Sequence, residues 1–304
     1  MAATIAITGA TGFVGRYLIE RLRPSGVAIR ALSRRGAIAG ATTIDGDLAD
    51  TDALEALTRD AGRVVHLAGL VKSPDPAAFA RINVAGTEQL ARAMAKGSGK
   101  LLLVSSLAAR HPNVSAYARS KRAAEEAALA VLGPERVTIL RPPAVYGPGD
   151  RATLLIFQQL AKGLLVAPGP RGARFSLIHV HDLALLIEGA LAGRLALPPL
   201  LEPDDQRPGG YGWADLAAIA GRTTGRKVRL LRVPTRLLRQ PARLCDALGR
   251  RFGLELPLTV DKLGELAHGQ WVAGGPPLPM LPPRITFEEG FGQTLDWYKE
   301  AGWL

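Results

Sequence analysis

Tyr117 and Lys121 are the residues of this chain whose types and spacing point most directly to chemistry. They stand four residues apart in the stretch YARSK, inside a helical pattern over 116–132, so both side chains fall on one helix face. A phenol has a pKa of about 10 and is a poor acid or base at neutral pH, but a close ammonium group stabilises the phenolate and lowers that pKa. The pair therefore predicts a general acid–base site, and an ordinary surface pair is the alternative that two residues alone leave open.

Two serines precede this helix and supply a third catalytic candidate. Ser105 and Ser106 follow the apolar run LLLV, for which a strand over 101–105 is predicted. A hydroxyl of Ser106, at the end of that strand, would hold a substrate oxygen beside Tyr117. The adjacent Ser105 is the alternative for this role.

Three glycines at intervals of three, Gly9, Gly12 and Gly15, stand near the N-terminus in the stretch TGATGFVG. They lie where a β-branched strand gives way to a helix that begins near Phe13. Glycines there let the chain turn tightly and let a pyrophosphate approach the main chain, and the helix start offers unpaired N–H groups. The stretch predicts a dinucleotide-phosphate site, with a plain strand-to-helix turn as the alternative.

Alternating strand and helix patterns must position these residues. Predicted strands cover 4–8, 27–33, 42–45, 64–67, 101–105 and 137–141, and predicted helices cover 14–22, 52–58, 76–94 and 116–132. This rhythm predicts an α/β fold with a Rossmann-type doubly wound parallel sheet, whose ligands bind beyond the carboxyl ends of the strands. We expect a nucleotide-binding domain over 1–150, which also receives segments near 173–195, and a smaller, mainly substrate-binding α/β region over 151–304.

Composition excludes several other classes of protein. Cys245 is the only cysteine, which excludes an intrachain disulfide framework and fits a reducing compartment. No basic leader with an apolar core precedes the first strand, and no apolar run approaches the roughly 18 residues of a membrane span. We therefore expect a cytoplasmic protein.

The motifs together resemble the extended branch of the short-chain dehydrogenase/reductase superfamily, the family of NAD-dependent epimerases and dehydratases. The resemblance covers nearly the whole chain through GDLAD (46–50), HLAG (66–69), NVAGT (83–87), VSS (104–106), YARSK (117–121), LRPPAVYGPGD (140–150) and HVHD (179–182). It implies that Tyr117 is the acid–base residue and that Lys121 tunes it and binds the ribose. It also implies that Ser106 holds the carbonyl oxygen.

The same resemblance names the residues that bind the cofactor. In that family a carboxylate at the end of the second strand binds the ribose 2′-OH of NAD, whereas an arginine accepts the 2′-phosphate of NADP. This strand ends with Ser33 and Arg34 and has no nearby acid, so we predict NADP and keep NAD as the alternative. The predicted cofactor-binding residues are Gly9, Thr11, Gly12, Phe13, Val14, Gly15, Ser33, Arg34, Asp47, Leu48, Ala68, Gly69, Asn83, Ser105, Tyr117, Lys121, Pro142 and Pro143.

Departures from the family pattern bear on the substrate. The interval from Ser106 to Tyr117 is shorter than usual, with LAAR (107–110) in place of the common VYG, and ARFSLIHVHD lacks the Arg-Asp pair typical of sugar-nucleotide enzymes. We therefore predict an NAD(P)-dependent oxidoreductase that acts on the secondary alcohol or ketone of a small-molecule, apolar substrate. One alternative is a nucleotide-sugar epimerase or dehydratase. The other is a non-catalytic NADP(H)-sensing or assembly protein, and the intact Ser-Tyr-Lys triad counts against this second alternative. A homodimer, common in relatives, stays open.

Histidines and a basic segment complete the sequence interpretation. His179, His181 and Asp182 lack a convincing further ligand, so no metal site is predicted, and His66 is interpreted as structural. Between residues 222 and 251 ten Arg or Lys face one acid, which accounts for +9 of the net charge of +11. The helical pattern over 235–251 is either a solvated basic face, a cover for the substrate cleft or a contact with an anionic membrane. Nucleic acid is not expected, because no stacking aromatics are interleaved.

Overall fold

The computed structural model describes residues 4–254, 256, 258–275 and 284–304. The chain divides into two compact units, one formed by residues 1–141 and 184–201 and the other by residues 142–183 and 202–304. The first unit contains all the strands predicted from the sequence. The division of roles between cofactor and substrate remains a prediction.

A seven-stranded parallel sheet forms the centre of the first unit, in the order β11-β6-β5-β4-β1-β2-β3. The strands are β1 (Thr4–Thr8), β2 (Ile29–Ser33), β3 (Thr42–Asp45), β4 (Ala61–His66), β5 (Lys100–Val104), β6 (Val137–Leu140) and β11 (Leu200–Leu201). The chain runs outward from β1 to β3 and then returns to add β4 on the other side of β1. In parallel sheets the ligand sits beyond the carboxyl ends at such a reversal.

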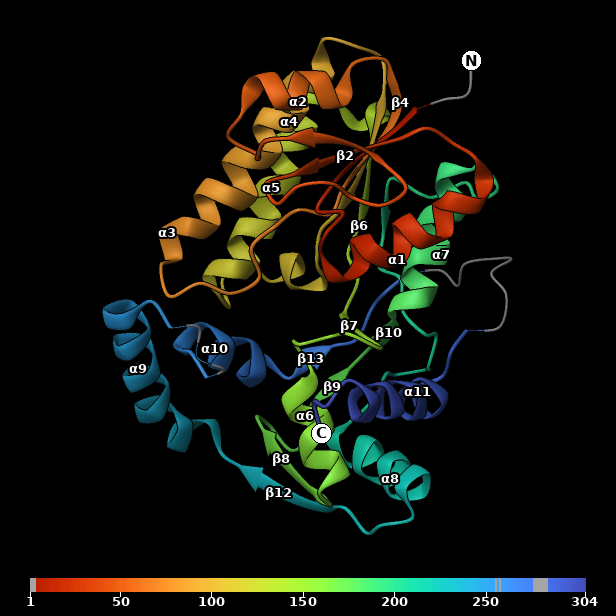
Figure 1. Ribbon diagram of the computed structural model, residues 1–304. Coiled ribbons are helices and arrows are strands. Elements are labelled where there is room, and N and C mark those ends of the chain that lie inside the picture. Colours follow the sequence, from red (N-terminus) through yellow and green to blue (C-terminus); the bar gives the residue numbers. More distant parts are fainter. Residues whose placement is uncertain (1–3, 255, 257, 276–283) are drawn as a thin grey trace. The chain divides into compact units, whose positions relative to one another are not determined.

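Helices cover both faces of this sheet (Figure 1). They are α1 (Phe13–Leu22), α2 (Thr51–Thr58), α3 (Pro76–Phe79), α4 (Gly86–Ala95) and α5 (Ala116–Leu132), with short 3-10 turns at Arg23–Ser25, Leu107–Arg110 and Pro134–Arg136. Figure 1 shows α2, α4 and α5 on one side of the sheet and α1 on the other, next to α7 (Val180–Leu191), whose residues are shared between the two units. The predicted helix over 76–94 is confirmed, with a π-helical stretch η2 (Ala80–Ala85) between α3 and α4.

The core of the first unit follows from the periodicity of its elements. Apolar residues of the strands meet the inward faces of α2, α4 and α5 in one buried cluster. Leu54, Leu90 and Leu132 are among the residues that the three helices contribute. The predicted doubly wound parallel sheet is confirmed, and most predicted element ends lie within a few residues of the observed ones.

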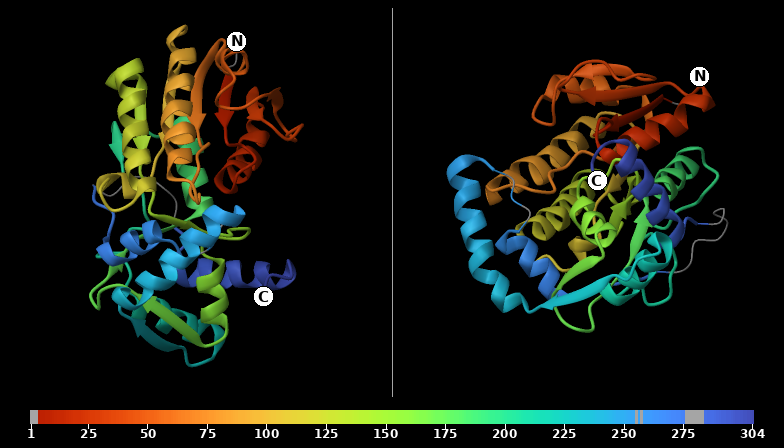
Figure 2. Two further views of the ribbon diagram at one scale, coloured as in Figure 1. Left: turned by 90° about the vertical axis from the view of Figure 1, so that its left-hand side faces the viewer. Right: turned by 60° about the horizontal axis from the view of Figure 1, so that its bottom comes forward.

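The second unit holds short parallel strand pairs with helices around them (Figure 2). Its elements are β7 (Ala144–Tyr146), α6 (Leu154–Ala161), β8 (Leu164–Pro168), β9 (Arg174–Phe175), β10 (Leu177–His179), α8 (Trp213–Thr224), β12 (Arg229–Val233), α9 (Thr235–Phe252), α10 (Val260–His268), β13 (Gln270–Trp271) and α11 (Phe287–Glu300). β7 pairs with β10, β8 with β12, and β9 with β13. No helix in the described ranges has the length and apolar character of a membrane span.

An aromatic cluster forms the core of this second unit. Phe157 stacks on Phe291 with ring centroids 5.1 Å apart, and Tyr298 meets Phe157 edge-on at 5.6 Å. Such pairs stabilise a core beyond their area of burial by roughly 0.5–1.5 kcal/mol each. The terminal helix α11 adds an apolar face to this core, since its Phe291, Leu295 and Tyr298 are all buried.

A buried ion pair joins α5 to the end of β6. Arg141 Nε lies 2.9 Å from Glu125 Oε1, and its Nη2 lies 2.5 Å from Glu125 Oε2. Both side chains are buried, whereas Glu126, the next residue, makes an exposed pair with Arg122. The two-point contact fixes α5 against the carboxyl end of β6, on the side of the sheet where the predicted catalytic residues lie.

Glu125→Gln tests this contact. Removing one member of a buried pair leaves the other charge uncompensated, so we expect the free energy of unfolding to fall by about 3–5 kcal/mol. Glu126→Gln is the matched control and should cost less than about 1 kcal/mol. Urea unfolding of both variants measures the difference, and equal costs would contradict the assignment.

Candidate active site

Lys121 is buried one helical turn after Tyr117, at the carboxyl edge of the sheet. Helix α5 begins at Ala116, and the Ser115 hydroxyl oxygen accepts the Ala118 N–H at 2.9 Å, which fixes the helix start. Lys121 Nζ donates to the carbonyl oxygen of Val104, the last residue of β5, at 3.0 Å. Burial lowers the pKa of Lys121 from 10.5 to about 8, and the charge of Glu125 partly opposes this shift.

Tyr117 is half-buried beside an aromatic neighbour. Its ring lies 6.1 Å from that of Phe79, a buried residue of α3, at an interplanar angle of 60°. With Lys121 four residues later on the same helix, the spacing predicted from the sequence is present. Their roles as acid–base residue and tuner remain predictions.

The two serines have different surroundings. Ser106 caps the 3-10 turn Leu107–Arg110, where its hydroxyl oxygen accepts the Ala108 N–H at 3.2 Å and keeps its own hydrogen available. Ser105 is held by its main-chain N–H on the Leu140 carbonyl oxygen at 2.7 Å. Its buried Oγ has no hydrogen-bond partner within the described chain. A buried hydroxyl in that state fits a bound polar molecule.

The glycine turn between β1 and α1 leaves its main chain accessible. Gly9 has φ +74°, and a Cβ there would lie 2.5 Å from Ala68 N; a Cβ on Gly15 would lie 2.2 Å from Gly9 O. Close packing of the chain on itself therefore requires these two glycines. Gly12 is exposed and begins α1 without a side-chain cap, so the first-turn N–H groups are left for a ligand. This arrangement fits the pyrophosphate of a dinucleotide.

The buried His66 anchors the start of the loop that follows β4. His66 Nε2 lies 2.9 Å from Thr87 Oγ1, and the Thr87 hydroxyl donates to Asn83 O, so the Nε2 nitrogen is the protonated one. His66 Nδ1 then accepts from the Thr8 hydroxyl at 2.5 Å. Burial, with the charge of Lys121, lowers the pKa of His66 to about 3, so the ring is neutral at pH 7. The structural interpretation of His66 agrees with these contacts.

Asn83 connects the loop after β4 to the active-site helix. Its Oδ1 accepts the Leu70 N–H at 2.7 Å, and its Nδ2 donates to Leu70 O and to Ser120 Oγ. The Ser120 hydroxyl in turn donates to Tyr117 O at 2.7 Å. Both amide hydrogens of Asn83 are thus used within the protein, which makes it a positioning residue. Direct contact of Asn83 with the cofactor remains a prediction.

Gly69 lies in this loop, against both Asn83 and Lys121. A Cβ at Gly69 would lie 3.3 Å from Asn83 Oδ1 and 3.8 Å from Lys121 Nζ. Gly69 is exposed and Ala68 half-buried, as a loop that passes over a ligand would be.

The residues predicted to choose between the cofactors follow β2 and β3. Ser33 is buried, and its hydroxyl oxygen accepts the Arg35 N–H at 3.1 Å, while the Arg34 side chain is exposed. Asp47 is exposed and Leu48 packs against Gly86, where a Cβ would lie 2.8 Å from Leu48 Cδ1. Among the other predicted contacts, Thr11 is exposed, Phe13 and Val14 are half-buried in the first turn of α1, and Pro142 and Pro143 belong to the second unit.

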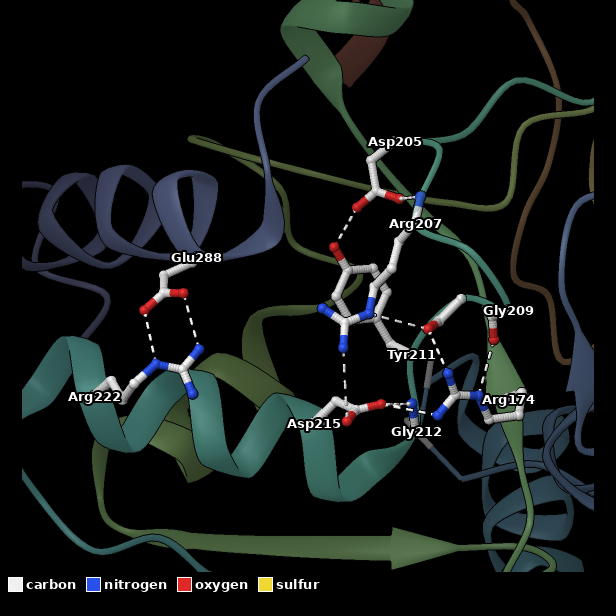
Figure 3. Close-up of polar contacts among 10 residues, drawn as sticks. Arg174, Asp205, Arg207, Gly209, Tyr211, Gly212, Asp215, Arg222 and Glu288 are labelled. Carbon is white, nitrogen blue, oxygen red and sulfur yellow. Dashed lines mark hydrogen bonds and ion pairs between the residues drawn. The ribbon is translucent and has the colours of Figure 1, made fainter. Parts of the chain in front are cut away.

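Two arginines of the second unit are occupied by its own chain (Figure 3). Arg174 donates to Asp215 Oδ2 at 2.9 Å and to the carbonyl oxygens of Gly209 and Gly210. Arg207 lies over the Tyr211 ring at 4.5 Å and 3.7 Å from Asp215 Oδ1. Both guanidinium groups are therefore committed to the start of α8 and the loop that precedes it.

The HVHD motif belongs to the packing of the same unit. His179 is buried, its ring lies 5.2 Å from that of Tyr146, and burial together with His181 lowers its pKa to about 4. Asp182 Oδ2 accepts the Ile285 N–H at 2.9 Å. Across the residues that the structure describes, no three His, Cys, Asp or Glu side chains form a metal-binding group.

Sequence reasoning missed the contacts that orient these residues. The Val104 carbonyl oxygen, Ser120, Thr8 and Thr87 contact predicted site residues but were not singled out. Ser120 had a local signal, since it stands between Tyr117 and Lys121. A carbonyl oxygen or a strand threonine has none, because only the tertiary fold brings it to its partner.

Comparisons with known proteins agree with this geometry. A family model described as "NAD dependent epimerase/dehydratase family" matches residues 5–194. The chain is 36% identical to the ceramide reductase of Caulobacter vibrioides, over 99% of this chain and 96% of that protein. It is 27% identical to the mitochondrial NADH-ubiquinone oxidoreductase 40 kDa subunit of Neurospora crassa, over 78% of this chain and 64% of the subunit.

A solved structure shows the same fold. The UDP-glucuronic acid 4-epimerase from Bacillus cereus, in complex with NAD, superposes with a TM-score of 0.71 at 17% identity, covering 98% of this chain and 99% of that chain. With the family model and the full-length relative, this confirms the resemblance inferred from the motifs. The chain belongs to the NAD-dependent epimerase/dehydratase family of extended short-chain dehydrogenases/reductases and is an NAD(P)-dependent oxidoreductase.

Proposed function

We propose that this enzyme is an NADP(H)-preferring reductase that converts a ketone on a ceramide-class lipid to the secondary alcohol. The chemistry rests on one observation, the buried Lys121 held on Val104 O one turn after Tyr117. The substrate class rests on the full-length similarity to a ceramide reductase.

The residues divide the reduction between them. When bound, the cofactor supplies a hydride for the carbonyl carbon. Tyr117 donates its phenolic proton to the carbonyl oxygen, and the Lys121 ammonium stabilises the phenolate that remains. Ser106 orients the carbonyl oxygen with its free hydroxyl hydrogen, because its oxygen already accepts from Ala108. The unpartnered hydroxyl of Ser105 supports a contact with the cofactor instead.

The second unit supports an apolar substrate over a nucleotide sugar. Binding a sugar diphosphate needs cationic or N–H groups that are free to meet two phosphates. Arg174, five residues before the HVHD motif, and Arg207 already share Asp215 (Figure 3). Releasing either one would leave Asp215 without that partner.

The Tyr117→Phe variant tests the reaction. Removing the proton donor should lower kcat by about 10²–10⁴-fold, because the carbonyl oxygen then lacks a positioned acid. The measurement is NADPH oxidation with long-chain ketones of the ceramide class, beside UDP-glucose as the nucleotide-sugar probe. NADPH binding, followed by fluorescence titration, should change much less than kcat, because Tyr117 is one of many predicted cofactor contacts.

Tyr17→Phe is the control, since it removes a phenol from another helix of the same unit. Equal turnover by native enzyme and Tyr117→Phe would refute the role of Tyr117. Conversion of UDP-glucose without net NADPH change, in the absence of ketone reduction, would favour an epimerase.

Arg34→Ala tests the choice of cofactor. Loss of a charge-assisted contact with the 2′-phosphate should weaken NADPH binding by about 10- to 100-fold and leave NADH binding unchanged. Arg35→Ala is the matched neighbour and should change neither affinity. If the native enzyme binds NADH more tightly, or if the loss follows Arg35, the assignment of Arg34 is wrong.

The pH profile of reduction tests Lys121. Because burial sets the pKa of Lys121 at about 8, its ammonium is present below pH 8 and is lost above it. The rate of ketone reduction at saturating substrates should therefore fall as the pH rises through about 8. A rate that stays constant up to pH 10 would contradict the role of the ammonium.

A stability measurement separates this effect from unfolding. The unfolded chain holds the Lys121 proton up to about 10.5, so it binds more protons than the folded chain between pH 8 and 10.5. Lys121 therefore contributes stability that rises with pH in this window, opposite to the change in rate. Lys121→Met should lack this contribution.

A further inference from the structure

Helix α9 carries an apolar stripe that the described chain leaves uncovered. Leu237, Leu244, Leu248 and Phe252 are spaced by seven, four and four residues, so they line one side of the helix. Their exposed fractions are 63%, 61%, 39% and 63%. An apolar face buried in a domain core would show values near zero.

The exposed apolar surface is concentrated around this helix. Seven of the thirteen large apolar residues exposed in the described chain lie between residues 231 and 260. Besides the stripe they are Leu231, Leu254 and Val260. Exposed apolar residues gathered on one helix side mark an interaction site, because soluble surfaces normally carry such residues singly.

A second side of α9 packs against α10. Ala242 and Gly249 are buried, and Asp246 Oδ2 accepts the Val260 N–H at 3.1 Å. Small residues on this side let the two helices approach closely. Figures 1 and 2 show α9 beside α10.

A third side of α9 is cationic. Its arginines are all exposed, and none makes an ion pair with a described residue. They are Arg236, Arg239, Arg243 and Arg250. Arg251 lies instead at the stripe, over the Phe252 ring at 5.7 Å. The one acid of the helix, Asp246, is occupied at the α10 side. The partner must therefore offer negative charge and an apolar phase together.

We infer that α9 docks on the surface of an anionic phospholipid bilayer. The stripe enters the boundary between headgroups and acyl chains, and the arginine side chains extend to the phosphates. A nucleic acid would match the charge but would leave the leucines in water. A second copy of this chain would cover the leucines but would bring the arginines together. The inference stands apart from the proposed reaction, since it needs neither cofactor nor ketone.

Vesicle co-sedimentation with the full chain tests the docking. The probes are vesicles of phosphatidylcholine alone and of phosphatidylcholine with phosphatidylglycerol in equal parts, neither containing a ketone. We expect the native chain to sediment with the anionic vesicles, less with the zwitterionic ones, and less again when salt is added. Sedimentation with neither vesicle would overturn the inference.

Two variants and their controls assign the contributions. Leu244→Gln should lower the partition coefficient about tenfold, and Arg239→Gln with Arg243→Gln should lower it about fivefold per arginine. The controls are Leu155→Gln, an exposed leucine of α6, and Arg119→Gln with Arg171→Gln, which remove the same charge elsewhere. Equal losses in variants and controls would contradict α9 as the contact.

Two further readouts separate the remaining outcomes. In one alternative outcome, light scattering shows that the native chain is a dimer which Leu244→Gln disrupts. If the native chain also fails to sediment with vesicles, the stripe is a subunit interface and the inference is wrong. NADPH oxidation with a detergent-dispersed ketone should be unchanged in Leu244→Gln. That result keeps a failure of docking distinct from a failure of the proposed reaction.

Discussion

The burial of one ammonium group governs the arrangement of the first unit. Removing a lysine from water is costly, and the lowered pKa of Lys121 records that cost. The fold offsets part of it with the Val104 carbonyl oxygen and the nearby charge of Glu125, which Arg141 holds in place. A lysine on an exposed face could swing away from Tyr117, whereas this one is buried and bound to Val104 O. The cost of burying Lys121 and its proposed role beside Tyr117 thus have the same structural origin.

Hydrogen bonds between polar side chains connect the helix that bears Lys121 to the loops at the strand ends. Asn83 binds Leu70 and Ser120, and Ser120 binds the main chain of Tyr117, so the loop after β4 and the first turn of α5 move together. His66 fixes the base of the same loop through Thr8 and Thr87. Because these groups satisfy one another inside the protein, the exposed main chain at Gly12 and Gly69 is what remains to meet a ligand.

The sequence predicts those parts of this fold that repeat locally. Period-two and period-3.6 patterns revealed the strands and helices of the first unit, and their alternation implied parallel order. Tyr117 and Lys121 could be paired because a helix fixes their spacing. Contacts between distant segments left no such trace: Arg141 was assigned to a strand end, and its pair with Glu125 depends on how α5 crosses the sheet. In the second unit β7, β9, β10 and β13 were missed because two or three residues carry no period, and the five-residue strands β8 and β12 were missed as well.

The second unit shows why family membership alone leaves the substrate open. Its core depends on aromatic packing around Phe157 and Phe291. This packing does not depend on which residues stand on the surface of the unit. Arg174 and Arg207 both contact Asp215, whereas the arginines of α9 make no ion pair within the described part of the chain and stand near exposed leucines. Water solvates arginine well, but contact between water and exposed leucine is unfavourable in free energy. A partner that covers the leucines would remove this unfavourable contribution. Docking of α9 on a bilayer, as proposed above, would also bring this enzyme to the phase that dissolves the proposed ceramide-class substrate.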